Sequence, residues 1–279
     1  MQIRRHRLHY DNGEPVRYVE SPNRGGALTP RFLIMHYTAG SSFESSLSHM
    51  TRRGTSASAH LLIGRDGAIA QLVPFNRVAW HAGRSRWQGL SGLNRHSIGI
   101  ELDNAGPLDR HGDQWRSWFG RDYPRDEVLV ARHKNGGRRR GWQTYSEAQI
   151  AAALEAATAL CRHYGLANIL GHDDVAPERK TDPGPAFAME SFRAAALGRG
   201  DEEPARFETI TRLNIRDRPG LDGAKLPEAP LASGTFLSLL SQQGKWAMVE
   251  VLDAEGMPET TGWVHSDYII AAQPEAATG

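Results

Sequence analysis

Two short, uninterrupted apolar runs constrain the fold of this chain more than any other feature. The first is RFLIMHY, from Arg31 to Tyr37, and the second is SIGIEL, from Ser97 to Leu102. Runs of this length without polar alternation are typical of strands buried on both faces, as in the middle of an α/β sheet. Each run carries one polar side chain near its end, His36 or Glu101. We therefore predict a central sheet with polar chemistry near its strand ends.

The longest predicted helix lies in YSEAQIAAALEAATALCRHYG. Ser146 and Gln149 form a capping box at its start, and Gly165 supplies the stop. Its apolar side chains recur at helical spacing, so we expect one buried face. That face comprises Ile150, Leu154, Ala157, Leu160, Cys161 and Tyr164.

Further elements alternate along the chain up to about residue 190. SSFESSLSHMTRR predicts a second helix, and AHLLIG and AIAQLV flank the turn RDG (Arg65 to Gly67) as a β-hairpin. A short strand, NILGH, leads to His172. Alternating strands and helices predict an α/β domain with a mixed central β-sheet flanked by helices.

The composition changes at GRGDEEPAR, Gly198 to Arg206, where glycine, acid and proline replace the apolar pattern. We place a linker at 199–206, between a domain at 1–198 and a second domain at 207–279. The second domain shows only short β-type runs separated by turn residues, which predicts a small all-β barrel. Most of Trp246, Trp263 and Tyr268 are expected in its core.

The charge balance argues against nucleic acid as a partner. The chain has 33 basic and 32 acidic residues and a formal net charge of +1, so it creates no strong overall field. A basic run, RHKNGGRRR, lies within residues 107–143, a segment to which the sequence assigns no fold. We interpret it as a solvated loop or a contact to an acidic polymer. The single cysteine, Cys161, excludes an internal disulfide and a multi-cysteine zinc cluster.

The N-terminal residues include several arginines but no apolar segment after them, and no 18-residue apolar run occurs. We expect no membrane span and a chain that is cytoplasmic as synthesised. Export by a signal-independent route to the cell wall is the alternative. The sequence does not define the oligomeric state.

A stiff, polar segment, GHDDVAPERKTDPGPAF, runs from Gly171 to Phe187. Pro183 and Pro185 restrict the backbone around Asp182, and rigid loops of this kind often carry sites. His36, His172 and Asp182 together make the three-ligand set of a catalytic zinc ion, which suggests hydrolysis. The alternative is that these histidines are surface or core residues, since the chain has 12 of them.

Four motifs in order, FLIMHYTAG, SASAHLLIGRDGAIAQLVPFNRVAWHAG, SIGIELDNAG and GHDDVAPERKTDPGPAF, resemble the type 2 N-acetylmuramoyl-L-alanine amidases. The resemblance covers about residues 30 to 190. It implies the zinc amidase fold, one zinc ion per chain on His36, His172 and Asp182, and a peptidoglycan or muropeptide substrate. The bond cleaved would join the lactyl group of N-acetylmuramic acid to L-alanine.

The resemblance also assigns roles to four other residues. Glu101 matches a general base and Lys180 a group that stabilises the oxyanion; the alternatives are a buried structural carboxylate and a solvated lysine. Trp80 and His81, in AWHAG, border the substrate groove or are packing residues. We expect His60 near the site but not as a ligand.

The C-terminal segments TRLNIRDRPGLDG, GKWAMVEV and GWVHSDYI resemble bacterial SH3 domains. Two other functions remain open from the residues alone. One is a non-catalytic peptidoglycan-binding protein of the same fold. It is disfavoured because all three ligand positions, and both helper positions (Glu101 and Lys180), carry side chains that are competent for catalysis. The other is a metal-dependent nuclease, which does not account for AWHAG or DPGPAF.

Overall fold

The computed structural model describes residues 1–197, 206–253 and 258–272. The chain divides into two compact units, Met1–Gly200 and Asp201–Gly279. Most of the predicted linker at 199–206 lies outside the described residues. No helix within the described ranges combines the length and the apolar character needed to cross a membrane.

The first unit is built on a six-stranded mixed sheet with the order β17-β5-β11-β6-β7-β3. Strands β17, β5, β11 and β6 run parallel to one another, β6 and β7 form the antiparallel hairpin, and β3 adds in parallel to β7. The fold class is confirmed for this unit. The strands are β3 (Arg17–Tyr18), β5 (Phe32–Tyr37), β6 (Leu61–Ile63), β7 (Ile69–Gln71), β11 (Ser97–Leu102) and β17 (Asn168–Gly171).

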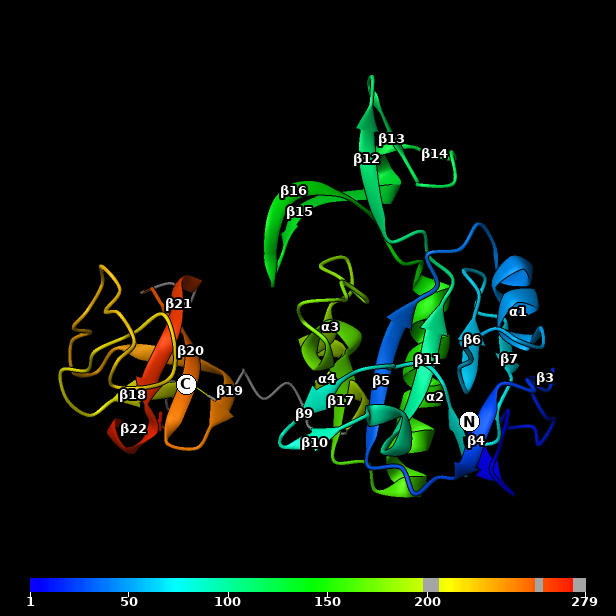
Figure 1. Cartoon of the computed structure of the whole chain (residues 1–279), viewed down its shortest axis with the longest axis horizontal. Coiled ribbons are helices and arrows are strands. Elements are labelled where there is room, and N and C mark those ends of the chain that lie inside the picture. Colours follow the sequence, from blue (N-terminus) through cyan, green and yellow to red (C-terminus); the bar gives the residue numbers. More distant parts are fainter. Residues whose placement is uncertain (198–205, 254–257, 273–279) are drawn as a thin grey trace, which may run out of the picture. The chain divides into compact units, whose positions relative to one another are not determined.

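Helices cover the sheet where the sequence presents apolar side chains. Helices α2 (Glu147–Tyr164) and α4 (Met189–Ala196) pack with Leu33, Met35 and Ile98 in the largest core cluster. Helix α1 (Phe43–Thr51) buries Leu47 and Met50 in a second cluster with residues of β6 and β7. Figure 1 shows α2 behind β5 and β11, and α1 beside β6.

The predicted ends of α2 are correct, whereas its buried face is shifted. The Ser146 hydroxyl accepts the Gln149 N–H, and Gly165 ends the helix in the left-handed region at φ 60°. The Gln149 side chain does not close the capping box, because it donates to the carbonyls of Ile63 and Asp103. The fully buried face comprises Gln149, Ala153, Ala156, Ala157, Leu160 and Cys161, while Ile150, Leu154 and Tyr164 are half-buried.

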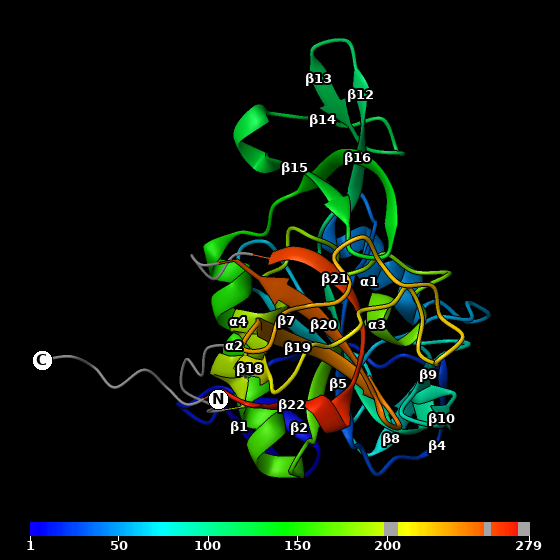
Figure 2. The ribbon, with the colours of Figure 1, turned by 90° about the vertical axis from the view of Figure 1, so that its left-hand side faces the viewer.

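Residues 107–143, which the sequence left unassigned, form a separate antiparallel sheet with the order β14-β13-β12-β16-β15. This insertion sheet has its own small core, which includes Leu108, Trp115 and Tyr123. Figures 1 and 2 both show it standing beyond the carboxyl ends of β5 and β11. Its elements are β12 (Pro107–His111), β13 (Gln114–Arg116), β14 (Asp122–Tyr123), the 3-10 helix η2 (Arg125–Glu127), β15 (Val128–His133) and β16 (Gly136–Gln143).

Short elements complete the first unit around this frame. They are β1 (Gln2–Arg4) with β2 (Arg7–His9), β4 (Arg24–Ala27) with β8 (Arg77–Ala79), β9 (Arg86–Trp87) with β10 (Leu90–Ser91), the 3-10 helix η1 (Leu93–Arg95), and the short helix α3 (His172–Val175). The predicted loop at Gly171 to Phe187 therefore begins with one turn of helix.

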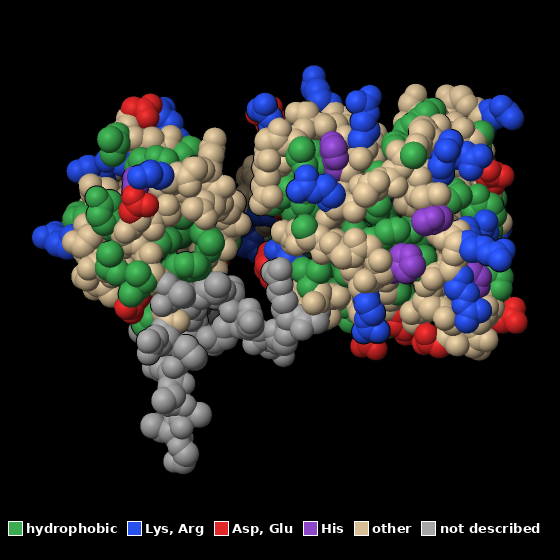
Figure 3. All heavy atoms as spheres, turned by 90° about the horizontal axis from the view of Figure 1, so that it is seen from below, with side chains coloured by type: hydrophobic (Ala, Val, Ile, Leu, Met, Phe, Trp, Pro, Cys, Tyr) green, Lys and Arg blue, Asp and Glu red, His purple; other side chains and the backbone are tan. Residues whose placement is uncertain are grey.

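The basic run of the insertion is paired within the chain. Arg138 and Arg140 both contact Asp109, at 2.8 and 3.1 Å, and the Arg139 guanidinium donates to the Val130 carbonyl. The basic run is thus largely occupied by internal contacts. Figure 3 views the molecule from below, the side away from the insertion, and there the Lys and Arg side chains of the first unit are spread out rather than gathered in one patch.

The second unit is a five-stranded antiparallel sheet with the order β21-β20-β19-β18-β22. Its core is aliphatic and includes Ile215, Leu237, Val249 and Val264. The expectation that most of its aromatic residues are core is wrong: Trp246 and Trp263 are half-buried and Tyr268 is exposed. The elements are β18 (Arg206–Thr209), β19 (Phe236–Gln243), β20 (Trp246–Leu252), β21 (Pro258–His265), the 3-10 helix η3 (Ser266–Tyr268) and β22 (Ile269–Ala271).

A buried histidine in the first unit predicts acid sensitivity of folding. His60 Nδ1 accepts the Gly99 N–H at 3.0 Å, and its Nε2 lies 2.9 Å from the Arg77 carbonyl. Burial lowers the pKa of His60 from 6.5 to about 4. Between pH 6.5 and pH 4 the His60 imidazole is therefore protonated in the unfolded chain but neutral in the folded chain. The contribution of neutral His60 to the free energy of unfolding is complete above pH 6.5 and is lost as the pH falls toward 4.

We expect His60→Gln to reduce this loss, since an amide accepts and donates at similar positions without titrating. Between pH 7 and pH 5 the free energy of unfolding of the variant should fall by about 2 kcal/mol less than that of the parent chain. Urea unfolding at both pH values measures the difference. An equal fall in both proteins would contradict the assignment.

Candidate active site

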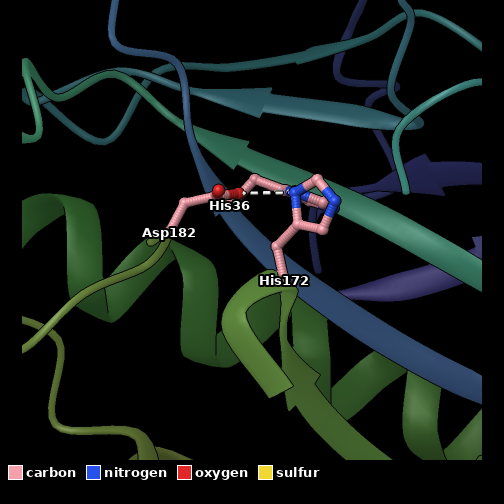
Figure 4. Close-up of side chains that lie close together, drawn as sticks. All are labelled: His36, His172 and Asp182. Carbon is pink, nitrogen blue, oxygen red and sulfur yellow. Dashed lines mark hydrogen bonds and ion pairs between the residues drawn. The ribbon is translucent and has the colours of Figure 1, made fainter. Parts of the chain in front are cut away.

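Three buried side chains from distant parts of the sequence converge at the carboxyl edge of the sheet. His36 Nδ1 lies 3.0 Å from His172 Nδ1 and 2.9 Å from Asp182 Oδ2, and His172 Nδ1 lies 2.8 Å from the same oxygen. Figure 4 shows the two rings and the carboxylate pointing toward one another. The sequence prediction brought together these same three residues, and they form the one potential metal-binding group found in the described part of the chain.

The sheet topology explains the convergence. Strands β5 and β17 are parallel neighbours in which Met35 pairs with Gly171, so His36 and His172 follow at the same edge. The chain then returns, and the Asp173 N–H donates to the Asp182 carbonyl at 2.8 Å. This bond places the Asp182 side chain against both imidazoles.

The AWHAG segment determines which nitrogen of each imidazole carries hydrogen. His81 Nε2 lies 3.3 Å from the Ser97 carbonyl, which only accepts, so His81 Nδ1 is left as an acceptor. His36 Nε2 lies 3.0 Å from His81 Nδ1 and must donate to it. His172 Nε2 donates to the Ala82 carbonyl at 3.0 Å. Both Nδ1 atoms of His36 and His172 therefore keep a free lone pair.

These tautomers provide a test of whether the group suits a metal ion. Two Nδ1 lone pairs and a carboxylate oxygen face one another, with the ring hydrogens committed elsewhere. Burial lowers the pKa of His36 to about 4, so its imidazole is neutral at pH 7. Two nitrogen lone pairs and a carboxylate oxygen that face one another in a buried site can all bind the same cation, so the group suits a metal ion.

Glu101 stands next to this group. In the parallel pairing of β11 with β5, Glu101 is the direct partner of His36, so both side chains emerge on the same face. Burial, with the nearby charge of Asp182, raises the pKa of Glu101 to about 8, and Lys180 opposes this effect. Glu101 Oε2 is buried and has no hydrogen-bond partner among the described residues.

A groove of about 660 Å³ opens over the site. Glu101, Asp182, His172 and Lys180 line it, as does Trp80, whose side chain is 37% exposed. His81 also borders the groove, but its ring atoms contact His36 and Ser97. His60 lies outside the metal-binding group, with its ring centroid 5.8 Å from that of His81.

Sequence reasoning missed a second set of contacts, which supports the other side of the site. His133, at the tip of the β15–β16 hairpin, lies 3.0 Å from Asp173, and both side chains are buried. Lys134 pairs with Asp173 and Asp174 at 2.9 and 2.6 Å. The insertion therefore holds α3, and with it His172.

Comparisons with known proteins agree with this geometry. A family model described as N-acetylmuramoyl-L-alanine amidase matches residues 26–185. N-acetylmuramoyl-L-alanine amidase AmiD of Escherichia coli (strain K12) is 30% identical over 237 residues, which cover 81% of this chain and 71% of AmiD. The 1,6-anhydro-N-acetylmuramyl-L-alanine amidase AmpD of the same organism is 38% identical over 138 residues, 49% of this chain and 56% of AmpD.

A solved structure gives the same result. The crystal structure of a selenomethionine derivative of AmpD superposes with a TM-score of 0.50 at 29% identity, over 70% of this chain and 99% of AmpD. The fold and the site define an amide-cleaving enzyme of the α/β class. The chain belongs to the N-acetylmuramoyl-L-alanine amidase family, and it hydrolyses the amide bond between the lactyl group of N-acetylmuramic acid and L-alanine. The predicted family and activity are confirmed.

The contact between His81 and His36 predicts a change in metal affinity. In His81→Ala the Nε2–H of His36 loses its buried acceptor, and loss of such a partner typically weakens metal binding about 10- to 100-fold. His81→Gln retains a carbonyl acceptor and should recover part of the affinity. Zinc competition with a chromophoric chelator measures both.

His49→Ala is the matched control, because His49 lines the same groove without a hydrogen bond to His36 or His172. Its zinc affinity should equal that of the parent chain. Unchanged affinity in His81→Ala would mean that His36 does not depend on His81.

Proposed function

We propose that this amidase uses one zinc ion held by His36, His172 and Asp182. The observation that carries the proposal is the convergence of two Nδ1 lone pairs and one carboxylate oxygen, within 3.0 Å of one another and buried. A bound zinc ion lowers the pKa of water and polarises a carbonyl group, which is the chemistry that amide hydrolysis needs. His81 and the Ala82 carbonyl keep the two imidazoles in the required tautomer.

Glu101 is proposed as the general base. It takes a proton from the attacking water and returns it to the leaving nitrogen of L-alanine. Two observations support this role: its Oε2 lacks a partner among the described residues, and burial raises its pKa to about 8. A general base is most effective when its pKa lies near the working pH, and the raised pKa brings Glu101 closer to neutrality.

Lys180 is proposed to stabilise the negative charge that develops on the scissile carbonyl oxygen. Lys180 precedes Asp182 by two residues in the sequence, and its side chain lines the groove. Its positive charge acts to lower the pKa of Glu101. The ammonium group forms no hydrogen bond or ion pair within the described residues. A cation beside a developing oxyanion stabilises the transition state more than the ground state.

The substrate proposed is peptidoglycan or its soluble muropeptides. The names of AmpD relatives specify 1,6-anhydro-N-acetylmuramyl-L-alanine, and the match spans just over half the length of those relatives. Trp80, partly exposed in the groove, is proposed to contact the substrate. The alternative of a non-catalytic binding protein is disfavoured by the presence of Glu101 and Lys180 beside a complete ligand set.

Replacing the base should separate chemistry from metal binding. Glu101→Gln should retain about one zinc ion per chain, whereas kcat should fall about 10²- to 10⁴-fold. Asp182→Ala should lose both zinc and activity, since a ligand is removed. Metal analysis and chromatography of the released peptide measure these outcomes. A zinc-loaded Glu101→Gln enzyme with the parent kcat would exclude Glu101 as the base.

The second unit is proposed to be an SH3-like module that binds the cell wall. Its support is the five-stranded antiparallel sheet with an aliphatic core, together with the sequence resemblance of its short motifs. All proposed catalytic residues lie before it in the sequence, so its proposed role is in binding rather than in the chemical step.

Truncation after Leu197 tests this division. The shortened chain should cleave soluble muropeptides with a kcat within about 2-fold of the parent value. Its action on insoluble sacculi should fall about 10-fold or more, because a tethered module raises the local concentration of the enzyme. Co-sedimentation with sacculi measures binding. Equal sedimentation and equal cleavage of sacculi by both proteins would rule out targeting.

A further inference from the structure

The insertion at 107–143 places one aromatic side chain in the substrate groove. Trp118, in the loop between β13 and β14, is 77% exposed, and it lines the same groove as Glu101 and Asp182. A single exposed aromatic residue on a protein surface is ordinary. An exposed indole in the groove of an enzyme is a different case, because a bound substrate can cover it.

The indole of Trp118 is held in place before any ligand arrives. Its Nε1–H donates to the Ala39 carbonyl at 2.8 Å, and Phe119 packs edge-on against it at 5.6 Å. The loop is closed by a hydrogen bond from the Ser117 N–H to the Arg121 carbonyl. Because the ring is already ordered, a ligand that covers it does not lose free energy in ordering it.

The two sides of the groove differ in chemistry. On the β17 side of β5, the loop after α3 contributes Arg179 and Lys180, the two Arg or Lys side chains that line the groove within the described residues. On the other side, the connection from β5 to α1 contributes the hydroxyl groups of Thr38 and Ser41. Trp118 belongs to this second side through its bond to Ala39.

The substrate also has two chemically different arms, joined at the amide that is cleaved. The peptide arm carries carboxylates, which complement Arg179 and Lys180. The glycan arm is uncharged and rich in hydroxyl groups, and the C–H faces of its sugar rings are slightly positive. Such faces are attracted to the negative face of an indole, as other positive edges are.

From this complementarity we propose that Trp118 is a stacking platform for the glycan arm, a binding subsite that the insertion supplies. The inference rests on the proposed substrate. It assigns the insertion a role in choosing substrates by their sugars, in addition to its contact with α3.

Binding of the two separated arms tests the proposal. Full-length, zinc-loaded protein carrying Glu101→Gln is titrated with a peptide-free tetrasaccharide of alternating N-acetylglucosamine and N-acetylmuramic acid whose lactyl carboxyl groups are capped as primary amides, so that the probe is uncharged like the glycan arm. The free stem peptide is titrated separately. Trp118→Ala should raise the Kd of the tetrasaccharide about 3- to 10-fold and leave that of the peptide within about 2-fold. Trp118→Phe, which keeps a ring but loses the bond to the Ala39 carbonyl, should raise the Kd of the tetrasaccharide less than Trp118→Ala does and leave that of the peptide within about 2-fold.

Tyr10→Ala removes an exposed aromatic side chain outside the groove and should change neither Kd. Three results would overturn the proposal: unchanged glycan binding in Trp118→Ala, an equal loss in Trp118→Phe, or a larger loss for the peptide than for the glycan. Turnover of a soluble muropeptide by the parent enzyme is measured alongside. Absence of turnover there would reject the proposed function itself, whereas normal turnover with unchanged glycan binding rejects only the role of Trp118.

Discussion

The parallel pairing of β5 with β11 is the constraint on which the site depends. It puts His36 and Glu101 side by side on one face, while Leu33, Met35, Ile98 and Ile100 fill the other face against the helices. A slip of one residue would turn His36 into the apolar core and expose a core side chain in its place. Burial of the core thus fixes the positions of a metal-ligand candidate and of the proposed base together, without any contact dedicated to that purpose.

The remaining parts of the site are held by polar contacts from both sides. On one side, a chain of hydrogen bonds runs from the Ser97 carbonyl through His81 to His36. On the other, the insertion hairpin binds Asp173 and Asp174 beside His172. Buried polar groups of this kind are costly unless every partner is satisfied, so each contact restricts the imidazoles to one orientation. The groove can therefore be open to substrate while the groups beneath it remain fixed.

The sequence predicts those features that depend on local signals. Apolar runs located β5 and β11, the Ser146 cap located α2, and the proline-restricted loop located Asp182. The insertion sheet was missed, although Asn135-Gly136 is a hairpin signal and both Gly136 and Gly137 have positive φ. Its strands carry arginines that pair with distant carboxylates, so in the sequence alone this run of charged residues is typical of a solvated loop. The contact of His81 with His36 spans 45 residues and arises only from tertiary packing.

Gly99 shows how closely two distant positions depend on each other. A Cβ at this position would lie 2.4 Å from Cγ of His81, so no side chain fits while the imidazole is present. Because Gly99 has no side chain, β11 leaves room for the ring that orients His36. Substitutions at positions 81 and 99 are therefore coupled in evolution: a chain that keeps the imidazole must keep the glycine, and a larger residue is tolerated at 99 only after the imidazole has been replaced.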